Sequence, residues 1–286
     1  MRIWKKAAAL AGLVAAAWAL LSTSGSWRWR QKTRALRAQL PAGAGTAGLR
    51  TVDFGRLAEL PPPVQRYLRK VLVEGAPTIA AVRLKQEGEF NMSEEGNRWA
   101  PFSADQWVRI RPPGFDWDAR IRLLPGVSVR VHDAYVAGEG ILHAAMLGLF
   151  PLVNLQGKGE IAKGELMRFL AEAAWYPTAL LPGQGVRWTA VDAGTARAAL
   201  DDGEISVELL FRFNAEDLIQ AVEAEARGRM VNRQIVASPW AGRFWGYERR
   251  SGMLVPLQGE VAWLFPDGPR PYWRGRMTKI EYRFTE

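Results

Sequence analysis

Three charged side chains recur at helical spacing in the middle of the chain: Glu165, Arg168 and Glu172. Residues three and four positions apart lie on one face of an α-helix, so the arginine has an acid on either side. On a solvated face, each such pair stabilises the helix by only about 0.3 kcal/mol. In a cleft, the same triad could orient a glutamate or bind an anionic head group through Arg168. Both interpretations stay open, and Trp175 on the charged side favours a covered face.

A second acidic pair, Asp116 and Asp118, flanks Trp117 in a segment of alternating character. Alternate residues of a strand point to the same face, so the two carboxylates are expected to lie close together. Paired acids can hydrolyse glycosides or bind a cation, but water-exposed strands also carry such acids routinely. His132 and Asp133 are neighbours, so we expect them to point to opposite faces and not to pair directly.

The chain has no cysteine and only two histidines, His132 and His143. This excludes thiolate nucleophiles, disulfides and cysteine-bound zinc, and it argues against a histidine-rich metal site. His143 lies in an apolar run and is expected to be a core residue rather than a base. The sequence contains neither a Gly-Xaa-Ser-Xaa-Gly nucleophile elbow nor a phosphate-binding glycine loop. We therefore expect no metal and no cofactor, and the sequence identifies no catalytic residue.

The net charge of +9 is confined to the N-terminal part of the chain. Residues 1–50 hold nine basic residues and no acidic residue, and the remaining 29 basic residues are balanced by 29 acidic ones. A nucleic-acid-binding domain would carry its own basic excess, so we expect no nucleic-acid partner. The charge indicates a membrane surface instead, contacted through residues 1–37.

Residues 7–27 form an uncharged run that follows three basic residues. This layout fits either a signal peptide, with a cleavage site near residues 22–24, or a retained single-pass anchor. Trp4 and Trp27 would lie roughly 35 Å apart along a helix. Interfacial tryptophans at that separation favour the anchor in the cell membrane.

These features divide the chain into three parts. Residues 1–27 are predicted to be a membrane anchor or uncleaved signal. Residues 28–48 are predicted to be a basic juxtamembrane segment followed by a flexible tether of small residues. Residues 49–286 are predicted to form a single β-rich domain.

The elements that must position the charged triad follow from hydrophobic periodicity. A helix over residues 165–176 would gather Leu166, Phe169 and Leu170 on the face opposite the triad. From residue 79 onward, short alternating segments between Pro/Gly turns predict antiparallel strands. We therefore predict a mainly β (α+β) fold, in which a strongly curved antiparallel sheet or half-barrel is crossed by one or two helices and preceded by a transmembrane helix.

Two segments are ambiguous. Residues 138–153 form the most apolar stretch after the anchor, typical of buried core or a packed loop. A flexible lip around an apolar pocket and a second membrane contact are the alternatives. Residues 215–227 have helical propensity but follow a turn signal, and we favour a strand there.

The body is rich in tryptophan, which either packs the core or lines a cavity for an acyl chain or another apolar ligand. The candidate ligand-binding residues combine the charged triad with four tryptophans: Glu165, Arg168, Glu172, Trp175, Trp188, Trp240 and Trp263.

Several segments together carry a family resemblance: Leu60-Pro-Pro-Pro-Val-Gln-Arg-Tyr-Leu-Arg69, Arg168 to Leu180 ending in Trp-Tyr-Pro-Thr-Ala-Leu, Ser238-Pro-Trp240, and Val261-Ala-Trp263 with Tyr272-Trp273. Over roughly residues 55–285 the chain resembles a family of bacterial membrane-associated proteins of unknown function. The resemblance implies no activity, substrate or catalytic residue. The expected architecture also resembles the β half-barrels of lipoprotein carriers, an analogy of fold alone.

The leading functional hypothesis is binding or carriage of an apolar or lipid ligand between the sheet and the crossing helix. One alternative is a hydrolase-type enzyme that uses the acids around Arg168. Another is a structural partner of other envelope proteins, for which a large exposed apolar patch would be evidence.

Overall fold

The computed structural model describes residues 2–40, 49–93, 96–231 and 234–286. The predicted tether of small residues, 41–48, lies outside these ranges. The helices are α1 (Arg2–Ala38), α2 (Pro62–Val71) and α3 (Glu160–Ala171), with 3₁₀-helices η1 (Phe54–Leu57), η2 (Glu172–Trp175) and η3 (Pro177–Leu180). The strands are β1 (Ile79–Asn91), β2 (Trp99–Arg109), β3 (Gly114–Leu124), β4 (Val127–Val136), β5 (Glu139–Met146), β6 (Phe150–Gly157), β7 (Val186–Asp192), β8 (Thr195–Asp202), β9 (Ile205–Phe213), β10 (Ile219–Val231), β11 (Gln234–Arg250), β12 (Met253–Phe265) and β13 (Gly268–Phe284).

All 13 strands belong to one antiparallel sheet in the order β6-β5-β4-β3-β2-β1-β13-β12-β11-β10-β9-β8-β7. Almost every neighbour in the sheet is also a neighbour in the chain, and only β1 and β13 pair across the whole sequence. The strands β6 and β7 lie at the two ends of this order, so the described sheet is open. The predicted mainly β, antiparallel fold with helices and a long N-terminal apolar helix is confirmed.

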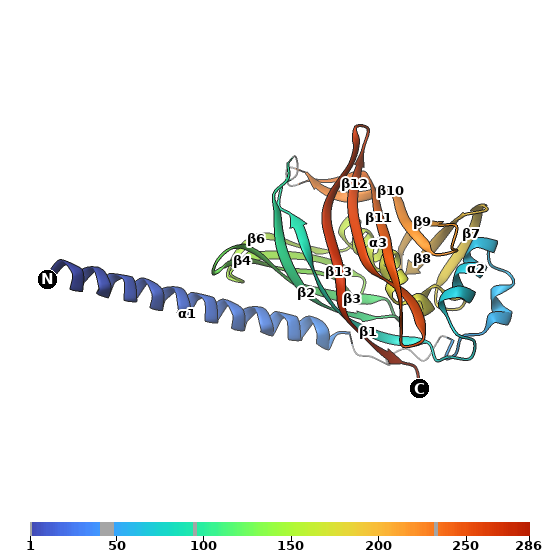
Figure 1. Cartoon of the computed structure of the whole chain (residues 1–286), viewed down its shortest axis with the longest axis horizontal. Helices are drawn as coiled ribbons and strands as arrows, with labels where there is room; N and C mark the ends of the chain where they lie inside the picture. The colour runs from blue at the N-terminus through green and yellow to red at the C-terminus, as the bar shows by residue number, and fades with distance from the viewer. Residues whose placement is uncertain (1, 41–48, 94–95, 232–233) are drawn as a thin grey trace.

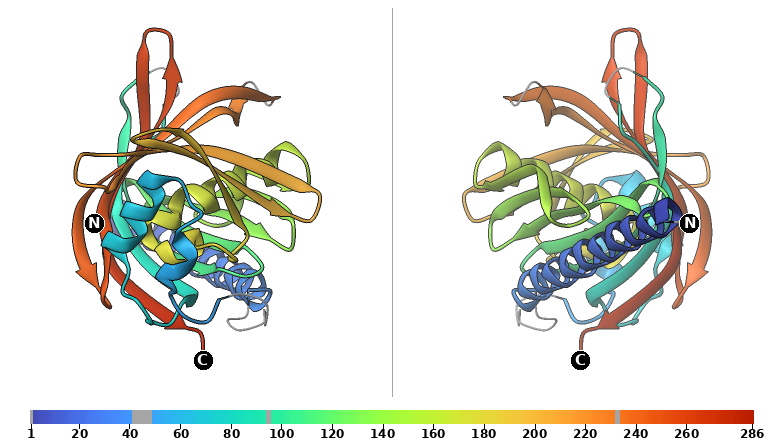
Figure 2. Two further views of the ribbon diagram at one scale, coloured as in Figure 1. Left: turned by 90° about the vertical axis from the view of Figure 1, so that its right-hand side faces the viewer. Right: turned by 90° about the vertical axis from the view of Figure 1, so that its left-hand side faces the viewer.

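Helix α3 lies between the two edge strands in the chain and contacts both halves of the sheet. It contacts β3, β4, β5 and β6 in one half and β9 and β10 in the other. Figure 2 shows α3 in the interior with strands on several sides. Its side chains Leu166, Phe169 and Leu170 are buried, as the periodicity predicted.

The bounds of this helix differ from the prediction of residues 165–176. The α-helix begins at Glu160, after a glycine with positive φ, and ends at Ala171. The chain continues as two 3₁₀-helices that are separated at Tyr176, where Pro177 disfavours α-helical geometry in the residue before it. The Tyr176 hydroxyl then donates a hydrogen bond to the Phe169 carbonyl at 2.6 Å, which fixes the tightened end.

The apolar segment 138–153 is not a loop or flexible lip, because it holds strand β5 and the start of strand β6. The alternation of a strand is hidden in its sequence because both faces of β5 are covered. Helix α3 contacts the strand, and α1 reaches it through Trp29 and Lys32, which contact His143. For residues 215–227, the favoured strand is confirmed from Ile219 onward by β10, whereas residues 215–218 form the turn before it.

Helix α1 extends away from the sheet at its N-terminal end (Figure 1). Its most apolar 18-residue window has a mean hydropathy of 1.7 and is not buried by the rest of the protein, so the helix is long and apolar enough to cross a membrane. The basic segment, residues 28–37, continues the same helix. Within this segment, Trp29 and Thr33 are buried against the sheet.

Candidate functional site

A cavity of about 230 Å³ lies between the C-terminal end of α3 and strands β10 to β13. Its inner end is closed by buried side chains such as Trp117 and Trp175, whereas Phe90, Met230 and Trp263 at the other end are only half-buried. Eight aromatic side chains form most of its apolar wall: Phe90, Trp117, Trp175, Trp240, Phe244, Trp263, Tyr272 and Trp273.

Six of the seven residues proposed from the sequence line this cavity: Glu165, Arg168, Glu172, Trp175, Trp240 and Trp263. Trp188 does not. It packs edge-on against Phe211, with ring centroids 5.1 Å apart, and its indole nitrogen donates to the Leu180 carbonyl at 3.0 Å. Trp188 is therefore a half-buried residue that packs against the core next to the chain that leaves α3.

The guanidinium of Arg168 is held by two carboxylates and two aromatic rings. Its Nε donates to Glu172 Oε1 at 2.8 Å, and its Nη1 forms an ion pair with Asp133 of β4. The group also lies 5.0 Å from the ring centroids of both Phe115 and Trp117. Of the two ion pairs predicted for Arg168, the one with Glu172 is present and buried. The second acid paired with Arg168 is Asp133 and not Glu165.

A chain of amide hydrogen bonds extends this cluster across the sheet. Glu172 Oε2 accepts from Gln106 Nε2 at 2.5 Å, and Gln106 Oε1 accepts from Gln86 Nε2 at 2.9 Å. Gln86 Oε1 in turn accepts from the Trp117 indole at 2.7 Å. Both oxygens of Glu172 are therefore occupied, and the cluster forms a rigid wall of the cavity.

Glu165 differs from its neighbours because it is only 7% exposed and its Oε2 has no hydrogen-bond partner among the described residues. Burial, and then the negative charge of Asp133, raise the pKa of Glu165 well above its ordinary value. Trp175 Nε1 and Asp133 Oδ1 also lack partners within the described ranges, and all three residues line the cavity. A ligand in the cavity could form hydrogen bonds with these buried groups.

Arg227 also lines the cavity, and no pattern in the sequence indicated this position. Its Nε donates to the Gly164 carbonyl and its Nη1 to the Tyr272 hydroxyl, both at 3.2 Å, and its guanidinium lies 5.0 Å from the Trp240 ring centroid. The register between β10 and β11 shifts between Ala224 and Arg227. This bulge turns Arg227 to the inner face, whereas strict alternation would place it outside.

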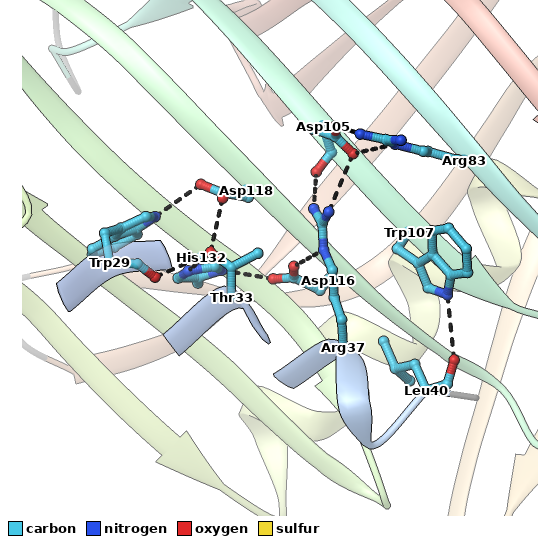
Figure 3. Close-up of polar contacts among 10 residues, drawn as sticks. All are labelled: Trp29, Thr33, Arg37, Leu40, Arg83, Asp105, Trp107, Asp116, Asp118 and His132. Atoms are coloured by element: carbon cyan, nitrogen blue, oxygen red, sulfur yellow. Dashed lines mark hydrogen bonds and ion pairs between the residues drawn. The ribbon is translucent and has the colours of Figure 1, made fainter. Parts of the chain in front are cut away.

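A second polar cluster fastens α1 to the outer face of the sheet (Figure 3). Trp29 and Thr33 donate to the two carboxylate oxygens of Asp118, at 2.8 and 2.9 Å. Arg37 pairs with Asp116 at 2.9 Å. Asp116 and Asp118 do share one face of β3, as predicted, but their partners are side chains four residues apart on α1.

His132 also belongs to this cluster. Asp116, His132 and Thr33 follow one another as the acid, histidine and hydroxyl of a hydrolytic triad do. Its Nδ1 lies 2.6 Å from Asp116 Oδ1, and its Nε2 lies 3.2 Å from Thr33 Oγ1. Thr33 is only 8% exposed, and its hydroxyl is also within hydrogen-bond distance of Asp118 and of the Trp29 carbonyl. The hydroxyl is therefore enclosed by its partners beneath α1, and the cluster serves to attach the helix. Asp133 points to the opposite face, as the sequence predicted.

Comparisons with known proteins place the sequence but assign no activity. No curated protein matches the chain. Similar solved structures include a LolA superfamily protein from Nitrosomonas europaea, with a TM-score of 0.37, 8% identity and coverage of 78% of this chain and 93% of that one. Another is a DUF1329 family protein from Desulfovibrio piger, with a TM-score of 0.32, 12% identity and coverage of 72% and 86%. Residues 58–282 match the DUF6920 family of unknown function, and the chain belongs to that family.

Proposed function

We propose that this protein is anchored in a membrane and binds an apolar or lipid ligand in the cavity between α3 and strands β10 to β13. The observation that carries the proposal is the aromatic wall, combined with a few buried polar groups that have no partner of their own. Small-molecule sites have this composition, because apolar contact supplies affinity and isolated polar groups fix orientation.

The contacts of α3 support a strongly curved, half-barrel sheet as the frame of this site. In the sheet order, β5 and β9 lie nine positions apart. At about 4.8 Å per strand, a flat sheet would hold them about 43 Å apart. One helix of about 10 Å diameter contacts both, so the sheet bends around α3.

The size of the cavity limits what it can enclose. Its volume of about 230 Å³ lies below the roughly 300–1,000 Å³ of sites that enclose a drug-sized ligand. A short ligand, or one end of a longer chain, fits this space. The half-buried outer end at Phe90, Met230 and Trp263 would let the remainder of a longer chain extend from the cavity.

The surroundings of α1 support the membrane anchor. The β5–β6 turn lies so close to α1 that a Cβ at Gly25 would be 2.2 Å from the Leu147 carbonyl oxygen. Phe150 and Leu152, which follow this turn, are exposed to solvent, and so is Leu124 at the end of β3. Apolar side chains beside the apolar helix would enter the interfacial layer of a bilayer that α1 spans.

Lipid analysis of the purified full-length protein tests the proposed function. We expect lipid to co-purify with the wild type and to be reduced in Val261→Phe, because Val261 lines the cavity and the larger ring fills it. Leu264→Phe is the matched control, since it lies three residues along the same strand and outside the cavity lining. Lipid at background level in the wild type, or equal lipid in both variants, would refute the proposal.

A hydrolase-type enzyme is the second candidate, and the raised pKa of Glu165 in the cavity favours it, since general acids are tuned in this way. The test is hydrolysis of p-nitrophenyl esters by the wild type and by Glu165→Gln. Turnover that the substitution abolishes would support an enzyme. A rate equal to that of buffer alone would reject it for esters.

A further inference from the structure

The buried polar groups of the cavity differ in how far the protein already satisfies them. Arg168 has two carboxylates and two rings as partners. Arg227 has only neutral partners, a backbone carbonyl and a tyrosine hydroxyl, and it forms no ion pair among the described residues. A guanidinium remains protonated in proteins, so Arg227 is a buried positive charge that no carboxylate contacts directly, although Glu165 and Asp133 act on it at longer range.

Beside the unpartnered acceptor Asp133 Oδ1, the cavity holds two hydrogen-bond donors that lack an acceptor among the described residues. Arg227 Nη2 forms no hydrogen bond within the described ranges, and the Trp175 indole N–H has no acceptor there. Burial, and then the negative charge of Asp133, raise the pKa of Glu165, which favours its neutral form beside a bound anion. A hydrogen-bond donor in a low-dielectric site binds an anion more strongly than it would in water.

The other arginines of the cavity do not offer the same opportunity. Arg168 is occupied, as described above. Arg229 is half-buried and lies 5.1 Å from the Phe265 ring centroid, while Arg243 is exposed. A charge near water gains less from pairing with an anion, because water and salt screen the interaction. Arg227 is therefore the best placed of the four lining arginines to hold a negative charge inside the cavity.

We propose that the ligand is an amphiphile with an acidic head group, carboxylate or phosphate, which binds Arg227 while its apolar part lies against the aromatic wall. This inference rests on the proposed function, since it specifies the ligand of the same cavity. The guanidinium carbon lies 5.0 Å from the Trp240 ring centroid, and Nη2 is left to contribute to a contact with the head group.

Binding of three probes with the same ten-carbon chain tests the inference: decanoate, decyl phosphate and the neutral decanol. The full-length protein is held in phosphatidylcholine nanodiscs near neutral pH, and quenching of the cavity tryptophans reports binding. In the wild type we expect at least one acidic probe to bind about tenfold more tightly than decanol, since a charge-assisted hydrogen bond contributes about 1.5–3 kcal/mol. Whether decanoate or decyl phosphate binds more tightly distinguishes a carboxylic from a phosphoric head group.

Variants then locate the effect. Arg227→Met should weaken the preferred acidic probe about tenfold and change decanol by less than about twofold. The matched control Arg229→Met should change both by less than about threefold, since its guanidinium is partly screened. Arg227→Lys, which keeps the charge but loses the planar fork, should lose part of the acid preference and serves if the methionine variant does not fold.

The possible results separate the two proposals. If decanol binds the wild type as tightly as both acidic probes, or if Arg227→Met weakens all probes equally, the acidic-ligand inference is wrong while the proposed function stands. If no probe binds the wild type, both are wrong. A preference for an acidic probe that disappears in Arg227→Met and persists in Arg229→Met supports the inference.

Discussion

Replacement of Trp29 by alanine tests whether the C-terminal part of α1 is an integral part of the fold. Trp29 is 1% exposed and stacks on His132 and His143, with ring centroids 4.5 and 5.1 Å away. Its indole nitrogen donates to Asp118 at 2.8 Å. The side chain thus contacts three strands, β3, β4 and β5, although the sequence predicts only a basic segment beside a membrane.

The magnitude follows from these contacts. Removal of a buried tryptophan side chain costs about 3–5 kcal/mol, which includes the cavity that is left. The lost indole hydrogen bond contributes about 1 kcal/mol of this, because Asp118 keeps the hydroxyl of Thr33 as a partner and is not left unsatisfied. We therefore expect Trp29→Ala to lower the free energy of unfolding by about 4 kcal/mol, a large part of the 5–15 kcal/mol typical of native proteins.

Urea denaturation of the full-length protein in detergent, followed by circular dichroism of the sheet, measures this change. Trp27→Ala is the matched control, since Trp27 lies two residues away on the same helix and is 60% exposed. It should change the unfolding free energy by less than about 0.5 kcal/mol. Equal effects of the two substitutions would refute the conclusion that α1 is attached to the sheet through its buried face.

Two further predictions concern the cavity. The raised pKa of Glu165 means that the folded state holds this proton more tightly, so stability should fall as pH rises from the ordinary value of 4.5 toward the folded-state pKa. Glu165→Gln should flatten this slope in urea titrations at about pH 5 and about pH 8, and an unchanged slope would contradict the assignment. Arg168→Met should cost about 3–5 kcal/mol in the same assay, because Asp133 and Glu172 lose their buried partner. The control Lys163→Met, which removes an exposed pair, should cost under about 0.5 kcal/mol, and similar losses in both would contradict the buried network.

The sequence predicted the cavity residues on α3 because helical periodicity separates two faces without reference to the rest of the chain. The side opposite the apolar stripe carried Glu165, Arg168, Glu172 and Trp175, and a large aromatic there indicated a covered face. The identity of the covering strands could not be predicted in the same way. Asp133 lies 35 residues before Arg168, and only the register of the sheet brings the two together.

The sequence contains a pattern that indicates the attachment of α1 to the sheet, but the apolar and basic character of this part of the chain favoured a membrane contact instead. Trp29, Thr33 and Arg37 are spaced four residues apart, which places them on one helix face. The first 50 residues contain nine basic residues and no acidic one. This excess of positive charge indicated a membrane surface more strongly than a contact with the rest of the protein. Their partners Asp116 and Asp118 were recognised as a pair, but a paired acid on a strand does not reveal which segment it binds.

The two buried arginines of the cavity give the last prediction, because the same substitution should have different effects at the two positions. Each guanidinium loses several kcal/mol of hydration on burial. At Arg168 two carboxylates offset this loss, so Arg168→Met leaves uncompensated acids and destabilises the fold. At Arg227 no carboxylate pairs with the charge among the described residues. Arg227→Met should therefore change the unfolding free energy by less than about 1 kcal/mol, or raise it. A buried charge that can be removed without loss of the fold is typical of a binding residue. A loss of 3 kcal/mol or more in Arg227→Met, about as large as in Arg168→Met, would show instead that Arg227 belongs to the structural network.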